Sequence, residues 1–221
     1  MGKILAVLGL VLLATTASAQ SERQQRAAEL EEVAVALADP DPMMRLAALE
    51  EILASGDRRT IGLATALAMR SEDRALRGAG MVAYMEQQGV IEFDLSYPGP
   101  LEEQYQAAQY DADKLNKFFQ DAGKLLGVFP KGIHGQGRKF TVAVELDDDQ
   151  MGGKAFSLMG SKRHEGDLRI NGDLAEMLFP TIPLSNRWHS CSLRITPTGE
   201  GLIGGDLRCG EGVYPVRFEV R

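Results

Sequence analysis

The apolar pattern of this 221-residue chain changes its period once, near the glycine-rich segment 132–137. Before that segment, from Ser21 to Gln88, the residues are mostly Ala, Leu, Met, Glu and Arg, which favour helices. After it, Phe140, Val142 and Val144 alternate with polar or small residues, as in a half-buried strand. The predicted fold class is therefore α+β and multidomain, with helices followed by a small antiparallel β-sandwich or barrel.

Four helices are predicted in the first part of the chain, which we delimit as residues 20–96. They cover residues 26–38, 42–54, 60–70 and 72–87. A shift of 32 residues places Asp41 on Asp73 and Arg45 on Arg77, and it also aligns small residues in the two segments. Self-similarity at a fixed offset indicates an internal repeat.

Each copy of this repeat has an Asp at a turn, an Arg four residues later, and small residues beyond it. The copies read Asp-Pro-Met-Met-Arg-Leu-Ala-Ala from residue 41 and Asp-Arg-Ala-Leu-Arg-Gly-Ala-Gly from residue 73. This pattern resembles the HEAT-type helical repeat. The resemblance implies a stack of helix hairpins that presents a surface to a partner protein, with Asp41, Arg45, Asp73 and Arg77 linking adjacent units. An unrelated four-helix array is the alternative, because small residues occur at helix crossings in any bundle.

Residues 97–130 are predicted to form one connecting helix. Pro100 suits the first helical position, and Pro130 prevents the helix from continuing. From Leu101 to Leu126, apolar or small residues recur about every 3.5 positions. This face is expected to be an ordinary core-facing helix stripe. Alternatively, it would cover the open end of the repeats or pair with a second copy, so we expect a monomer or a weak dimer.

Residues 131–221 are predicted to form a β-rich domain of six short strands. These cover residues 140–146, 154–160, 167–174, 189–195, 202–209 and 214–220. A hairpin turn at residues 197–200 would place Cys191 opposite Cys209 and Leu193 opposite Leu207, all on one face of the sheet. We therefore expect a disulfide between Cys191 and Cys209.

The N-terminal residues 1–19 have the pattern of a cleaved secretory signal peptide. Lys3 precedes an apolar run from Ile4 to Ala14, and Ala17-Ser18-Ala19 offers small residues for cleavage. No later stretch is apolar over enough residues to insert into a membrane. The mature chain is expected to begin at Gln20 and to be periplasmic or secreted.

Charge and motifs exclude several function classes. The chain has 24 basic and 31 acidic residues and no basic stripe, which makes nucleic acid an unsuitable partner. Its histidines, His134, His164 and His189, lack the spacing of metal ligands, and no catalytic motif is recognisable. We therefore expect no metal, no cofactor and no enzymatic activity.

The favoured interpretation is an exported, non-enzymatic protein of the cell envelope that binds a partner protein or acts as a scaffold. The alternative is a β domain that binds a small ligand, a glycan or calcium. In that case Trp188 would stack on the ligand, and Asp147, Asp148 and Asp149 would supply oxygen ligands. A hydrolase is a third possibility.

Overall fold

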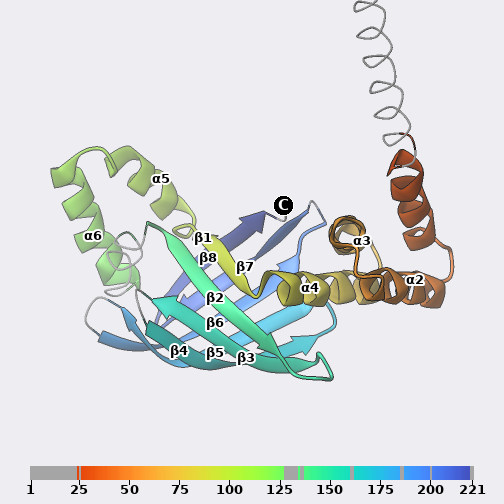
Figure 1. The fold of residues 1–221 in the computed structure, drawn as a ribbon. Coiled ribbons are helices and arrows are strands. Elements are labelled where there is room, and N and C mark those ends of the chain that lie inside the picture. The colour runs from red at the N-terminus through yellow and green to blue at the C-terminus, as the bar shows by residue number, and fades with distance from the viewer. Residues whose placement is uncertain are drawn as a thin grey trace, which may run out of the picture. The chain divides into compact units, whose positions relative to one another are not determined.

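The computed structural model describes residue 24 and residues 26–126, 134, 137–159, 162–184, 187–199 and 201–219. The predicted signal peptide at residues 1–19 lies outside these residues. The chain divides into two compact units, Met1–Ala64 and Thr65–Arg221, and the boundary falls inside helix α3 (Arg58–Arg70). Figure 1 labels the helices and strands of both units.

The first unit is helical. It contains a helix over residues 26–37, helix α2 (Pro42–Ala54) and the first part of α3. Helix α2 begins where predicted, because the Asp41 side chain accepts a hydrogen bond from the Met43 backbone N–H (2.9 Å) and Pro42 occupies the first turn. The buried apolar side chains described in this unit form a small core; they are Val33, Leu37, Leu49 and Ala64.

The two copies of the repeat have the same local geometry. Arg45 donates from Nη1 to the carbonyls of Asp39 (2.6 Å) and Pro40 (3.3 Å), six and five residues before it. Arg77 donates to the carbonyls at the same offsets, those of Ser71 and Glu72 (both 3.0 Å). Each repeat arginine therefore fixes the turn that precedes its own helix, while stacking of the HEAT type stays a prediction.

The second unit is built on a closed β-barrel (Figure 1). Every strand pairs antiparallel with the next, and β1 closes the ring by pairing with β8 through Asp94 opposite Arg217 and Leu95 opposite Val216. The eight strands found among the described residues are β1 (Val90–Leu95), β2 (Lys139–Leu146), β3 (Gly152–Met159), β4 (Lys162–Asn171), β5 (Leu174–Leu184), β6 (Arg187–Pro197), β7 (Leu202–Cys209) and β8 (Gly212–Glu219).

Alternate residues of each strand fill the barrel interior. In β1, for example, Ile91, Phe93 and Leu95 are buried and the residues between them are exposed. Phe93 and Phe140 are among the largest fully buried side chains of the chain. An eight-stranded barrel is just wide enough for its side chains to fill it, so these residues form a continuous core.

Helix α4 (Arg74–Gln88) lies at one end of the barrel and leads directly into β1 (Figure 1). Its residues Met81 and Met85 belong to the barrel core. The helix also approaches the turn between β4 and β5 closely, because a Cβ atom added at Gly78 would lie 2.4 Å from the Gly172 carbonyl oxygen. Glycine at position 78 is therefore a requirement of packing.

Helices α5 (Pro100–Ala108) and α6 (Ala112–Leu126) form a hairpin at the other end of the barrel (Figure 1). Tyr97 joins this hairpin to the core, since its ring centroid lies 5.0 Å from that of Tyr105, 5.1 Å from that of Phe118 and 6.4 Å from that of Tyr214. The Arg138 guanidinium lies over the Tyr105 ring at 4.7 Å. Aromatic contacts therefore close this end.

The fold-class prediction was wrong. The β part is a closed barrel instead of a sandwich, and the helices are short. Strand β1 precedes the α5–α6 hairpin, so the strands do not all follow the helices. The predicted strand at residues 167–174 is in fact the end of β4 and the beginning of β5, separated by a turn at Gly172 (φ +62°).

The prediction of a single connecting helix was also wrong. The chain breaks between α5 and α6, where the backbone N–H of Asp111 bonds to the Ala108 carbonyl (3.0 Å) and the Asp111 side chain accepts from the Asp113 N–H (3.1 Å). An Asp in this position begins a new helix. Gly127 and Pro130, at the end of the predicted helix, lie outside the described residues.

The predicted disulfide and its register are confirmed. Cys191 and Cys209 are bonded across β6 and β7, and Leu193 lies opposite Leu207. No helix in the part of the chain that the structure describes is long and apolar enough to span a membrane. The disulfide is compatible with an exported protein.

Candidate functional site

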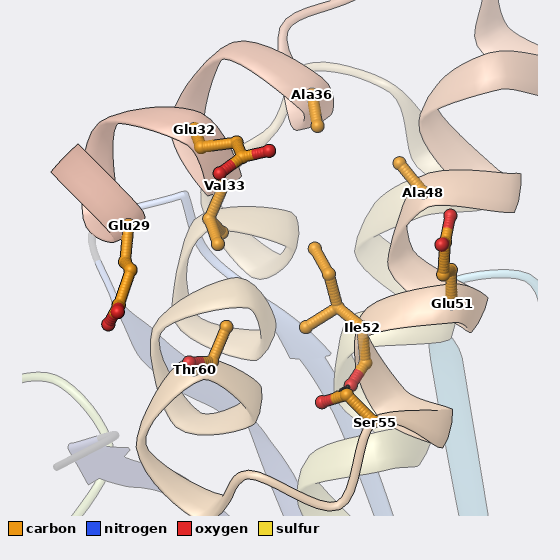
Figure 2. A pocket seen from close by; sticks show the side chains of 9 residues that line it. All are labelled: Glu29, Glu32, Val33, Ala36, Ala48, Glu51, Ile52, Ser55 and Thr60. Carbon is orange, nitrogen blue, oxygen red and sulfur yellow. Dashed lines mark hydrogen bonds between the residues drawn. The ribbon is translucent and has the colours of Figure 1, made fainter.

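The helical unit contains a hollow of about 350 Å³ between the helix at residues 26–37, helix α2 and the start of α3 (Figure 2). One face of the helix at residues 26–37 and one face of α2 form its walls, and Thr60 of α3 forms part of its base. The lining residues are Glu29, Glu32, Val33, Ala36, Ala48, Glu51, Ile52, Ser55 and Thr60.

The two helices line the hollow with the same spacing. In each helix the lining residues follow the first one at three, four and seven positions, which places them on one helical face. Glu32 and Val33 on the first helix are matched in this spacing by Glu51 and Ile52 on α2. Figure 2 shows Val33 and Ile52 pointing into the hollow from the two helices. The result is an apolar floor with carboxylates beside it.

The hollow is acidic. Three glutamates line it, and no Lys or Arg is among its lining residues. Glu32 and Glu51 are exposed, and within the described residues neither makes a salt bridge. Between residues 26 and 64 the sequence has eight acidic and four basic residues, so this part of the chain is acidic as well.

A second hollow of about 690 Å³ adjoins the first and shares Glu29, Ser55 and Thr60 with it. Arg26, Leu30, Asp57 and Arg59 complete its lining. The two adjoining hollows share lining residues, and we call the two hollows together the helical groove. Its second half carries both signs of charge, unlike the first.

Asp57 and Thr60 fix the start of α3 at the base of the helical groove. The Asp57 carboxylate accepts a hydrogen bond from the Thr60 backbone N–H (3.0 Å) and another from the Thr60 hydroxyl. These two bonds, the hydroxyl first, lower the pKa of the Asp57 carboxyl below its ordinary value. The side chain therefore caps the helix as a carboxylate.

The helical unit also exposes large apolar side chains. Met43 is 71% exposed and Val35 is 67% exposed, and Leu30 and Met44 are exposed as well. Isolated exposed apolar residues are ordinary, but here they accompany a small core and an open apolar groove. The described residues that line the groove include no histidine or cysteine.

The predicted repeat residues make hydrogen bonds to residues near them in the sequence. Asp41 and Asp73 cap helices α2 and α4, and Arg45 and Arg77 bind the preceding turns. Arg77 has a second role, because it also binds Asp173 in the turn between β4 and β5. None of these four residues lines the helical groove.

The residues proposed for ligand binding are not brought together. Asp147, Asp148 and Asp149 lie in the turn between β2 and β3, at the α4 end of the barrel, where Asp149 accepts a bond from the Met151 N–H (3.0 Å). Trp188 is exposed near the start of β6, at the α5–α6 end, with its ring 5.9 Å from that of His164. Among the described residues, no group of three or more potential ligands is arranged to hold a metal ion.

Sequence reasoning missed two sets of residues. One is Asp173, whose carboxylate bonds to Arg74 Nε and Arg77 Nη2 (both 2.7 Å) and attaches α4 to the barrel. The other is the groove pair Glu32 and Glu51. The signal for that pair was present, because Glu-Glu-Val and Glu-Glu-Ile stand at matching places on two neighbouring helices.

Comparison with known proteins adds no family. No protein-family model matches the chain, and no curated protein or solved structure matches it either.

Proposed function

We propose that this protein is exported and, without enzymatic activity, binds a partner protein through the helical groove of its N-terminal unit. The observation that carries the proposal is the groove itself: an open, apolar-floored depression in a unit with a small core and exposed apolar side chains. A depression of this kind suits a helical segment of another protein.

In this proposal the β-barrel has a structural role and does not itself bind the partner. Its interior is occupied by large side chains such as Phe93, Phe140 and Phe179, which supports a structural role over the binding of a small ligand inside it. Its end at α4 is closed by packing, and its hairpin β6–β7 is linked covalently.

Export is supported by the signal-peptide pattern at residues 1–19 together with the disulfide. The test is mass spectrometry of the protein isolated from its native host. We expect the mature N-terminus at Gln20 and the Cys191–Cys209 bond intact. A chain that retains Met1 in a reducing compartment would contradict export.

Partner binding is tested by site-specific photo-crosslinking of the full protein in its native host. A photoreactive amino acid at Ser55, which lines both hollows, should give a discrete crosslinked product. The matched position is Glu211, which is exposed in the turn between β7 and β8 and should give none. A product from Glu211 alone, or from neither position, would refute the role of the groove.

A further inference from the structure

We infer that the segment bound in the helical groove is an amphipathic helix with Lys or Arg beside a face of small apolar residues. This inference rests on the proposed function and names the chemistry of the partner. It concerns the first hollow, between Glu32 and Glu51, where the lining charge has a single sign.

The shape of the hollow favours a helix over an extended peptide. An extended segment usually binds by adding a strand to a sheet edge, and the described part of the helical unit contains helices and turns but no strand. Ala36 and Ala48 line the hollow with small side chains, which leave room for another helix to approach closely. Val33 and Ile52 supply the apolar contact.

The charge of the hollow selects the sign of the partner. Glu32 and Glu51 are exposed, and no basic side chain lines the hollow with them. A partner helix with Lys or Arg three or four residues apart could place its cations beside these carboxylates while its apolar face covers the floor. An acidic helix would instead bring like charges together, which opposes binding.

Selection from a library of helix-favouring peptides displayed on phage tests the inference, with the mature protein from Gln20 as the target. We expect the enriched peptides to carry net positive charge, with Lys or Arg at spacings of three or four beside Ala and Leu. Binding of one enriched peptide, followed by fluorescence anisotropy, should weaken as salt is raised, because the attraction is electrostatic.

Two double variants make a matched comparison in the same assay. Glu32→Lys with Glu51→Lys reverses the charge in the groove and should weaken binding by about tenfold or more. Glu31→Lys with Glu50→Lys makes the same change at exposed neighbours outside the lining and should weaken it by less than about threefold. Equal losses from the two variants, enrichment of acidic or uncharged peptides, or no enrichment at all would overturn the inference.

The test of the partner's charge can fail while the test of the groove as a binding site succeeds. Crosslinking from Ser55 to a partner segment without a basic helix would leave the groove as the binding site and overturn the inference about charge. Basic peptides that bind with strength unaffected by the groove variants would also overturn it, whatever the crosslinking result.

Discussion

Asp173 is a single carboxylate that attaches a helix to the barrel. It bonds to two arginines of α4, of which Arg77 is largely buried and Arg74 is 65% exposed. Partial burial by itself would raise the pKa of the Asp173 carboxyl, but the hydrogen bonds from Arg77 and Arg74 outweigh it and the pKa is lowered below 3.8. Most of the stabilisation comes from Arg77, because solvent screens the Arg74 charge.

Asp173→Asn is expected to lower the free energy of unfolding by about 2 kcal/mol near neutral pH, since it leaves the Arg77 guanidinium without its charged partner. A carboxylate with a lowered folded-state pKa stabilises the protein above its unfolded pKa, and this stabilisation is lost as the pH falls through the folded value. Urea denaturation should therefore show the difference from wild type shrinking below about pH 4.

The control for this prediction is Asp148→Asn, which removes an exposed carboxylate at the same end of the barrel. It should change the free energy of unfolding by less than about 0.5 kcal/mol. A difference between Asp173→Asn and wild type that is as large in acid as at neutral pH would contradict the role assigned to the charge.

Helix α4 and the turn between β4 and β5 meet without room for another atom. A Cβ at Gly78 would lie 2.4 Å from the Gly172 carbonyl oxygen, whereas a Cβ at Gly123 in α6 would meet nothing within 4 Å. Both glycines lie inside helices, where alanine is intrinsically favoured by about 1 kcal/mol. The surroundings should therefore give the same substitution opposite effects.

Gly78→Ala is expected to destabilise the protein by about 1–3 kcal/mol, because backbone must move to admit the methyl group. Gly123→Ala should stabilise it by up to about 1 kcal/mol. Thermal and urea denaturation of the two variants would measure both effects. Stabilisation by Gly78→Ala would mean that α4 does not pack on this turn as described.

Individual elements were predictable where local chemistry marks them. The start of α2 was predictable from Asp41 and Pro42. The register of β6 and β7 was predictable because it places the cysteines and the apolar residues around them on the same face of the sheet. Strand β5 was missed because Pro180 and Pro183 are unusual in strands. Pro180 lies at an irregularity in the β5–β6 pairing between Phe179 and Ile182, whereas Pro183 is in register opposite Trp188.

The whole molecule depends on contacts that no local pattern encodes. Apolar and acidic residues alternate from Ile91 to Leu95, so strand β1 could have been predicted from the sequence. Its pairing with β8 could not, because that pairing joins parts of the chain that lie far apart in sequence. The candidate site was only partly predictable for a similar reason, since the matching Glu-Glu pairs are visible in the sequence but the groove between them is not. Its residues have an ordinary helical spacing, and the groove exists only because of how far apart the helices pack.

Barrel closure predicts which fragments fold. Residues 131–221 form the β domain expected from sequence, yet this fragment lacks β1 and leaves β2 and β8 with unpaired edges. Residues 58–221 retain every strand and the helices at both ends. We expect the longer fragment to unfold cooperatively with wild-type near-ultraviolet circular dichroism, and the shorter one to lack a cooperative transition or to aggregate. Cooperative unfolding of residues 131–221 would contradict the closed barrel.

The pairing of the first strand with the last also sets the order of events when the chain is made. Synthesis starts at the N-terminus, so β1 is complete while its partner β8, about 120 residues later, does not yet exist. The β6–β7 hairpin is local, and its cysteines, 18 residues apart, can meet before the ring closes. The moment at which the protein becomes resistant to proteases is therefore decided by the final strand to emerge.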